Sequence, residues 1–283
     1  MGTTHQTETG QATHWSGGAG RAWVTAQALL DPMFKPFEDL LVARIGAASA
    51  QRVLDVGCGT GSTTLAVARQ LGERGHCLGA DVSAPMVAAA RARAEQEGSA
   101  ARFILADVQT HAFEPASFER IISRFGVMFF DNPVQAFENL LRAASSDAEL
   151  AFIAWRSAAD NPFMTTAERA AAPLLPNLPV RRPGAPGQFA FADRQRVDSI
   201  LEDSGWLGID IQPIDVQCSL PENQLIDYLT QLGPVGLCLQ EADQHTRKQV
   251  VETVRSAFDP YVHGADVHYT AACWMVCARA PSA

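Results

Sequence analysis

The chain is poor in lysine: Lys35 and Lys248 are the only lysines among 22 basic residues, and 31 acidic residues bring the net charge to −9. Such a chain lacks the positive surface that sequence-independent phosphate binding requires, so we expect no nucleic-acid partner. Charged residues make up 19% of its 283 residues and apolar residues 47%. That balance excludes intrinsic disorder and supplies a large core, arranged as one decorated domain or two.

Several other features are missing. No apolar run approaches the roughly 18 residues that a membrane span needs, and the polar first 15 residues lack the apolar stretch of a secretory signal, so we expect neither. The six cysteines form no C-x-x-C pair and no cluster with histidine, so we expect no metal site and a reduced, cytoplasmic compartment. The preference for arginine over lysine suggests a GC-rich, bacterial genome.

Strand-like and helix-like segments alternate between about residues 51 and 155. The expected strands are 51–56, 76–81, 102–105, 120–123 and 149–155. Such alternation implies right-handed crossovers and a parallel sheet, which defines an α/β fold. Beyond Trp155 the alternation stops. The expected elements there are a helix at 193–204 and strands at 209–218 and 267–279.

The pattern divides the chain into a core and segments that decorate it. The expected core consists of residues 46–156, a helix and strand in 191–220, and the last strand in 264–283. The remaining segments are expected to cover the core as a lid. They are a pair of helices in 1–45, an irregular Pro-, Ala- and Gly-rich insertion in 157–190, and a helical insertion in 221–263.

The strongest motif is the run D-V-G-C-G-T-G at residues 55–61, which joins an apolar strand to a helix. Glycines let the backbone turn sharply and approach a ligand, and the helix directs free N–H groups toward it. The third glycine comes one residue earlier than in the dinucleotide fingerprint. Asp55 is expected to point toward the ligand, where a carboxylate suits a positive charge better than a pyrophosphate. A nicotinamide-dependent oxidoreductase is therefore the less favoured alternative, and a purely structural turn is the other.

Two further acids follow the next two strands. Asp81 lies twenty residues beyond Gly61, where a carboxylate can accept both hydroxyl hydrogens of a ribose. Ser83 suits the cap of the following helix, which leaves Asp81 free for a ligand. Asp107 follows the third strand. Because the carboxyl ends of parallel strands face one crevice, we expect the glycine turn, Asp81 and Asp107 to share one ligand.

With these residues the chain resembles the class I S-adenosylmethionine-dependent methyltransferases, whose D-x-G-x-G-x-G motif it matches in full. The resemblance implies a Rossmann-like, mostly parallel seven-stranded sheet in the order 3-2-1-4-5-7-6, with an antiparallel last strand, helices on both faces and a helical lid. It implies S-adenosylmethionine as the cofactor and S-adenosylhomocysteine as its product. The implied cofactor-binding residues are Asp55, Gly57, Cys58, Gly59, Gly61, Asp81, Val82, Met86, Asp107, Val108, Ser123 and Arg21.

For two of these residues the resemblance implies a particular contact. Asp107 would accept a hydrogen bond from the adenine amino group, and Arg21 would hold the methionyl carboxylate. Two later segments narrow the resemblance to a bacterial group related to the ubiquinone/menaquinone C-methyltransferases. They are S-R-F-G-V-M-F-F at 123–130 and N-P-V-Q-A-F-E-N-L at 132–140. The chain departs from the usual Pro-Gly-Gly turn before the fifth strand, where A-S-S-D at 144–147 can still form a turn.

The acceptor is less well defined by the sequence. Methyl transfer needs an acceptor in line with the methyl at roughly 3–3.5 Å, but it forces no particular residue type. We therefore assign no catalytic residue and expect transfer to O, N or C of a small, apolar or aromatic molecule. The candidate acceptor contacts are His14, Trp15, Arg124, Phe129 and Trp155. Two alternatives stay open: a cofactor-binding protein without turnover, and, for Arg124, a pairing with a neighbouring acid. A homodimer is also left open.

Overall fold

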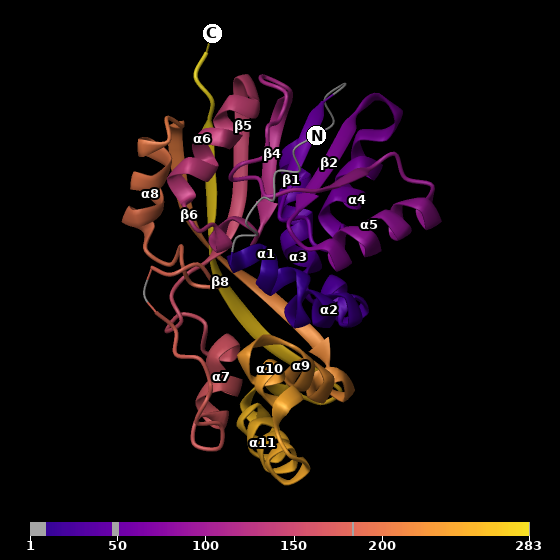
Figure 1. Ribbon diagram of the computed structural model, residues 1–283, viewed down its shortest axis with the longest axis vertical. Coiled ribbons are helices and arrows are strands. Elements are labelled where there is room, and N and C mark those ends of the chain that lie inside the picture. The colour runs from indigo at the N-terminus through magenta and orange to yellow at the C-terminus, as the bar shows by residue number, and fades with distance from the viewer. Residues whose placement is uncertain (1–9, 47–50, 183, 283) are drawn as a thin grey trace, which may run out of the picture.

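The computed structural model describes residues 10–46, 51–182 and 184–282, so parts of the expected lid at 1–45 and of the core at 46–156 lie outside it. The described residues form one open sheet of eight strands with helices packed around it (Figure 1). The strands are β1 (Arg52–Val56), β2 (His76–Asp81), β3 (Arg102–Leu105), β4 (Phe118–Arg124), β5 (Ala144–Trp155), β6 (Leu207–Pro221), β7 (Val262–His263) and β8 (Asp266–Arg279).

The order of the strands in the sheet is β3-β2-β1-β4-β5-β8-β6, with the short β7 paired to β8. Strands β1 to β5 run parallel, and β8 runs antiparallel to both of its neighbours. The expected Rossmann-like α/β fold is therefore confirmed. The strand numbers differ from the expected order 3-2-1-4-5-7-6 only because the two-residue strand β7 comes before the last strand in the chain. The last strand is therefore numbered β8, and it occupies the position that was expected for strand 7.

The helices fall into three groups. Within the described residues the N-terminal group has three members, α1 to α3, where a pair was expected. The other helices belong to the core or to a helical group beyond the sheet. The helices are α1 (Gly10–Ser16), α2 (Gly18–Thr25), α3 (Gln27–Ile45), α4 (Ser62–Leu71), α5 (Ala84–Glu97), α6 (Pro133–Ala143), α7 (Pro162–Ala171), α8 (Arg194–Asp203), α9 (Leu225–Gln231), α10 (Gly233–Glu241) and α11 (Gln244–Ala257). Among the described residues, no helix combines the length and apolar composition of a membrane span.

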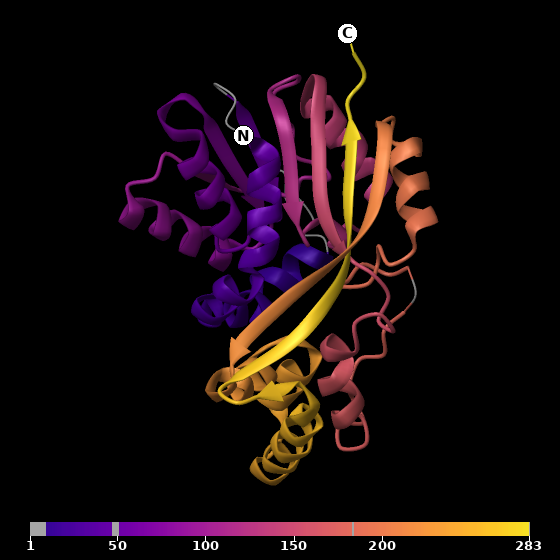
Figure 2. The same cartoon turned by 180° about the vertical axis from the view of Figure 1, so that it is seen from behind.

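The helical group α7, α9, α10 and α11 lies beyond the carboxyl ends of the parallel strands (Figure 1). The long antiparallel ribbon of β6 and β8 leaves the sheet and reaches this group (Figure 2). Helices α1 and α2 lie between the sheet and the group in both views. The carboxyl ends of the parallel strands are therefore covered by helices from two parts of the chain, the N-terminal α1 and α2 and the later helical group.

Local sequence explains where the core helices begin and end. The Ser83 side chain accepts a hydrogen bond from the backbone N–H of Met86 at 3.5 Å and caps α5, and Gly98 ends that helix with a φ of 61°. Asn132 caps α6 in the same way. In the segment 144–147, β5 begins at once, and Asp147 adopts a φ of 60°, a left-handed conformation that aspartate tolerates better than most residues.

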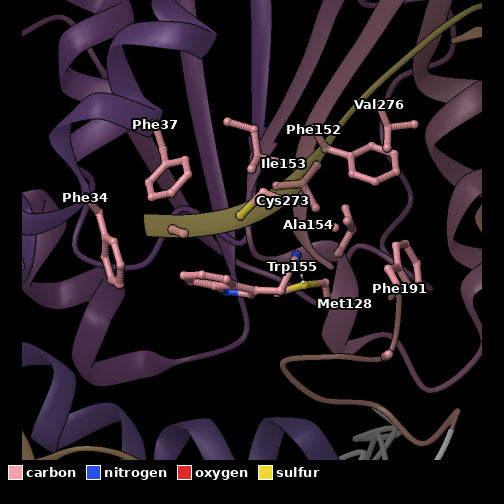
Figure 3. Close-up of a cluster of buried hydrophobic side chains, with 14 of the residues drawn as sticks. Phe34, Phe37, Met128, Phe152, Ile153, Ala154, Trp155, Phe191, Cys273 and Val276 are labelled. Atoms are coloured by element: carbon pink, nitrogen blue, oxygen red, sulfur yellow. Dashed lines mark hydrogen bonds between the residues drawn. The ribbon is translucent and has the colours of Figure 1, made fainter. Parts of the chain in front are cut away.

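A buried aromatic cluster joins α3 to the sheet (Figure 3). Phe37 of α3 and Trp155 at the end of β5 are 0% and 3% exposed, and their ring centroids lie 6.1 Å apart. The backbone N–H of Trp155 donates to the Met128 sulfur at 3.4 Å, and the cluster continues to Phe191 on the other side. Helix α3 is therefore part of the core, which leaves α1 and α2 as the N-terminal cover.

Candidate cofactor and acceptor sites

A cavity lies at the carboxyl ends of β1 to β4, and we call it the strand-end cavity. The glycine turn after β1, the acids after β2 and β3, and the residues after β4 line it together with the N-terminal helices. The lining residues used below are Gln11, Trp15, Trp23, Leu30, Asp31, Phe34, Val56, Gly57, Gly59, Thr60, Asp81, Val82, Met86, Asp107, Val108, Gln109, Arg124, Phe125, Gly126 and Phe129. The expected convergence of the strand ends on one crevice is thus present.

The glycine turn touches the segment after β4, backbone against backbone. Gly57 has a φ of 68°, and a Cβ added to it would lie 2.7 Å from the Cα of Gly126. A Cβ on Gly126 would lie 2.5 Å from the carbonyl oxygen of Val56. The need for glycine at position 126 leaves no signal in its own segment, because it arises from contact with the turn at Gly57.

The other two glycines of the turn serve different purposes. A Cβ on Gly61, whose φ is 88°, would meet the Phe103 ring at 2.8 Å, so this glycine permits helix α4 to pack. A Cβ on Gly59, whose φ is 56°, would have only the Met86 sulfur within 4 Å, at 3.7 Å. Gly59 lines the cavity and Gly61 does not. The missing side chain at Gly59 therefore leaves space for a ligand, whereas the missing side chain at Gly61 leaves space for the Phe103 ring.

This difference predicts unequal effects on stability. Gly59→Ala should lower the free energy of unfolding by about 1 kcal/mol, the cost of a left-handed alanine. Gly61→Ala should add to that backbone cost about 1–3 kcal/mol of overpacking against Phe103. Urea denaturation of both variants measures the difference. Equal destabilisation by the two substitutions would contradict this division of roles.

Asp81 is held by the backbone around it. Its Oδ2 accepts from the N–H of Gly59 and its Oδ1 from the N–H of Ser83, both at 2.8 Å. Burial raises the pKa of this carboxyl, and the backbone N–H groups lower it in part. Because each carboxylate oxygen can accept more than one hydrogen bond, both remain able to accept a ribose hydroxyl from the cavity.

Asp107 is fixed by the residue two positions later. Its Oδ1 accepts from the backbone N–H of Gln109 at 3.0 Å and from the Gln109 side-chain amide at 3.1 Å. The Gln109 Oε1 in turn accepts from the backbone N–H of Asn132 at 2.9 Å. The carbonyl of Val108 accepts from the Asn139 amide at 2.7 Å. Nothing in the sequence distinguished Gln109, yet it lines the cavity and orients Asp107.

Asp55 is placed differently from the expectation. Its side chain is 1% exposed, accepts from the Thr64 hydroxyl at 2.6 Å, and is not among the residues that line the cavity. Val56 lines the cavity in its place, because successive strand residues point to opposite faces. Burial raises the pKa of the Asp55 carboxyl to about 7, although the Thr64 bond and the Arg124 charge oppose it. Asp55 therefore supports the turn from behind.

The remaining candidates divide between lining and support. Val82 and Met86 line the strand-end cavity, whereas the side chain of Cys58 is buried outside its lining. The hydroxyl of Ser123 donates to the carbonyl of Val56 at 2.7 Å and accepts from the N–H of Gly126 at 3.1 Å, so it ties β4 to β1. Arg21 is exposed on α2 and does not line the cavity, in contrast to its expected contact with the cofactor.

A second cavity, the lid cavity, occupies about 420 Å³ between the N-terminal helices and the helical group. Its walls come from α1, α2, α3, α7, α9 and α10, from the loop residues 181 and 186–188, and from the ends of β4 and β5. Most of them are aromatic or aliphatic. Its lining includes His14, Ala22, Met128, Trp155, Phe163, Met164, Ala167, Glu168, Arg181, Gln188, Tyr228, Leu229, Gln231 and Phe258.

The two cavities share one wall, the common wall, formed by Gln11, Trp15, Trp23, Leu30, Phe34, Phe125 and Phe129. Of the candidate acceptor contacts, Trp15 and Phe129 belong to this wall, and His14 and Trp155 line the lid cavity alone. Arg124 lines only the strand-end cavity. The wall holds no acidic or basic side chain, so the two cavities adjoin each other over a largely apolar surface.

Phe125 is the strained member of the common wall. Its φ is 66°, a region that bulky residues rarely occupy, and its ring stacks on Trp155 with the centroids 4.7 Å apart and the planes 13° apart. Such strain persists only where the surroundings enforce it and often marks a functional site. At this turn Arg124 lines the strand-end cavity alone, whereas Phe125 lines both the strand-end cavity and the lid cavity.

The polar groups of the lid cavity are few. Glu168 and Arg181 form a bidentate ion pair with each other, and Arg181 also donates to Gln188 at 3.2 Å. The Tyr228 hydroxyl has the Met164 sulfur as its partner, at 3.9 Å. Of the histidines in the described residues, only His14 lines either cavity, and its side chain is exposed. No group of three acidic, histidine or cysteine side chains gathers for a metal within the described part of the chain.

The N-terminal cover is fastened to the strand ends. The Ser83 hydroxyl donates to the carbonyl of Trp15 at 2.7 Å, and the Ser16 hydroxyl donates to the carbonyl of Val82 at 3.2 Å. Helices α1 and α2 meet so closely at Gly20 that an added Cβ would lie 1.8 Å from the Trp15 carbonyl oxygen. These contacts place Trp15 over the strand-end cavity.

Comparison with known proteins points to one family. Residues 53–147 match a family model described as a methyltransferase domain. A demethylmenaquinone methyltransferase of Lactiplantibacillus plantarum is 32% identical over 111 residues, which cover 38% of this chain and 47% of that protein. Aklanonic acid methyltransferase DauC of Streptomyces sp. strain C5 is 28% identical over 120 residues, which cover 42% and 54%. The chain thus spans about half the length of these curated relatives.

Similarity to solved structures covers more of the chain. Phosphoethanolamine N-methyltransferase 2 of Haemonchus contortus, solved with phosphomonomethylethanolamine and S-adenosylhomocysteine, superposes with a TM-score of 0.57 at 17% identity. The superposition covers 95% of this chain and 59% of that one. At that identity the likeness establishes the fold, including the segments outside residues 53–147.

Proposed function

Residues 53–147 belong to the class I S-adenosylmethionine-dependent methyltransferases, and on this basis we propose that the chain methylates a small, apolar acceptor held in the lid cavity. The observation that carries the proposal is the common wall. It brings a cavity suited to the cofactor and a cavity suited to an apolar molecule into contact over one set of side chains. The names of the two sequence relatives support the same reaction class.

The strand-end cavity fits S-adenosylmethionine in the order of its strands. Asp107 after β3 suits the adenine, Asp81 after β2 suits the ribose hydroxyls, and the open space at Gly59 after β1 admits the chain beyond the ribose. When bound, this cofactor supplies an electrophilic methyl group on a positively charged sulfur. In its ionised form, the buried Asp55 carboxyl behind the turn would favour such a positive charge, and that charge would in turn favour ionisation of Asp55.

The lid cavity fits an uncharged or weakly polar aromatic molecule. Its volume is typical of sites for small ligands, and aromatic and aliphatic side chains together make up most of its walls. Its two charged residues, Glu168 and Arg181, neutralise each other. The Tyr228 hydroxyl, whose partner is a weakly accepting sulfur, is available to bind an oxygen or nitrogen of the acceptor.

The common wall indicates how the chain acts on the reaction. Within the described residues it contains no group that titrates, so we assign no general base to it. Trp15, Trp23 and Phe129 would exclude water from the space between the two cavities and fix the approach of the acceptor. The chain would contribute orientation and desolvation.

The decisive experiment combines methyl-labelled S-adenosylmethionine with a panel of phenols, quinones, amines and carboxylic acids. We expect labelled product from apolar aromatic members, and we expect calorimetry to show binding of S-adenosylhomocysteine but not of NADH. Ala167→Phe, which fills the lid cavity away from the common wall, should preserve S-adenosylhomocysteine binding and lower the transfer rate at least tenfold. Binding without transfer to any acceptor would instead favour a cofactor-binding protein without turnover.

A further inference from the structure

Arg124 is a half-buried cation that faces the strand-end cavity with most of its donors free. It is the last residue of β4, and its one hydrogen bond in the described structure goes to the carbonyl of Phe34, at 3.4 Å. Its guanidinium carbon lies 5.9 Å from the centre of the Phe34 ring. No carboxylate among the described residues lies within ion-pair distance of it. Its remaining N–H groups therefore open onto the cavity.

The acids around Arg124 are already engaged elsewhere. Asp31 is paired with Arg93 at 2.8 Å, Glu38 accepts from the Ser62 hydroxyl at 2.5 Å, and Asp55 accepts from the Thr64 hydroxyl. Both terminal nitrogens of Arg93 are engaged, because Arg93 also donates to the carbonyl of Thr60 at 2.9 Å. Arg124 is thus the cation of this cavity that has no counter-ion.

An unpaired cation in such surroundings favours an anionic ligand. Burial lowers the pKa of the Arg124 guanidinium, although the neighbouring acids offset part of this effect. Arginine nevertheless stays protonated in proteins, so its desolvated charge gains most from an anion that it can bind in bidentate fashion. A carboxylate matches that fork of donors.

The position of Arg124 in the sheet selects one part of the cofactor. Strand β4 lies next to β1 and two strands beyond β2, so Arg124 is beside the glycine turn and remote from the Asp107 end of the cavity. Of the adenine, ribose and methionyl parts, only the methionyl part carries a carboxylate. Resting on the proposed function, we infer that Arg124 binds the α-carboxylate of S-adenosylmethionine and S-adenosylhomocysteine.

This assignment gives Arg124 a positioning role. The next residue, Phe125, belongs to the common wall, so a carboxylate held by Arg124 anchors the methionyl chain beside the surface that the acceptor touches. The carboxylate contact is thereby assigned to Arg124 and not to Arg21, which the sequence suggested for this contact and which is exposed on α2.

The test compares ligands that differ only at the amino-acid end. Calorimetry of the wild type and of Arg124→Met, Arg124→Lys and Arg21→Met would use S-adenosylhomocysteine, its decarboxylated analogue and 5′-methylthioadenosine, which lacks the amino-acid part. Arg124→Met should weaken S-adenosylhomocysteine binding at least tenfold and leave 5′-methylthioadenosine binding within twofold. Arg124→Lys should retain part of the affinity, and Arg21→Met should retain all of it. The wild type itself should bind the decarboxylated analogue at least tenfold more weakly.

The possible results distinguish a carboxylate contact of Arg124 from a structural role and from no role in the site. Equal weakening of all three ligands by Arg124→Met would reduce Arg124 to a structural role, and unchanged affinities would remove it from the site; either overturns the inference. A loss confined to Arg21→Met would move the carboxylate to that residue. If Arg124→Met does not fold, the wild-type comparison with the decarboxylated analogue and the Arg124→Lys variant still measure the carboxylate contact. Failure of the wild type to bind S-adenosylhomocysteine at all would overturn the proposed function and this inference together.

Discussion

Asp81→Ala is expected to lower the affinity for S-adenosylhomocysteine about 100-fold. The ribose hydroxyls would lose a charged acceptor, a contact worth roughly 1.5–3 kcal/mol, which is at least a factor of ten. The same substitution releases the backbone N–H groups of Gly59 and Ser83, so the loss should lie near the upper end of that range. Isothermal titration calorimetry measures it directly.

Two further variants make this result specific. Asp81→Asn should be milder, since an amide oxygen still accepts one hydrogen bond. Asp131→Ala removes an exposed acid that lies outside the strand-end cavity and should leave the dissociation constant unchanged. A folded Asp81→Ala protein that binds S-adenosylhomocysteine as tightly as the wild type would refute the ribose contact.

Gly20→Ala is expected to lower methyl transfer at least tenfold while the core stays folded. Its Cβ would lie 1.8 Å from the Trp15 carbonyl oxygen and 2.6 Å from the Ser83 hydroxyl, so α1 could no longer sit on the strand ends. Trp15 would then leave the common wall and admit water to it. Helix α3, whose Phe37 is fully buried, would still complete the core. Labelled-methyl assays measure the rate, and thermal denaturation checks the fold.

The matched control for Gly20 is in the same cover. Gly10→Ala adds a methyl group with no atom within 4 Å and should leave the rate unchanged. Hydrogen exchange should show residues 10–25 becoming more protected when S-adenosylhomocysteine binds to the wild type, and less so in Gly20→Ala. Full transfer activity in Gly20→Ala would mean that the N-terminal helices do not complete the site.

The sequence predicted that Asp81 and Asp107 face the same crevice because that information is local. An acid at the end of each of two adjacent parallel strands must face the same crevice, whatever the rest of the chain does. The direction of the Asp55 side chain could not be predicted from the local sequence in this way. Strand β1 is buried on both faces, so its residues show no alternation that reveals which side chain faces the cavity.

The residues that were missed depend on distant partners. Gly126 is required by a contact with Gly57, and Phe125 is strained against Trp155, so neither shows a signal in its own segment. The lid cavity depends on how helices from both ends of the chain meet, which periodicity does not encode. Arg124 was recognised as important within its motif, but only the partners of Asp31, Glu38 and Asp55 show that Arg124 has no direct ion pair among the described residues.

The two cavities have separate origins in the chain. Residues 53–147, which match the family model, supply the glycine turn, Asp81, Asp107 and Arg124 but only three of the lid-cavity residues named above or in the common wall: Phe125, Met128 and Phe129. The rest of the lid cavity comes from segments inserted before and after that domain. Insertions and exchanges in such segments leave the sheet undisturbed. If the lid cavity holds the acceptor as proposed, acceptor preference can diverge in evolution, or be exchanged between relatives by grafting helices, while the methyl donor stays the same.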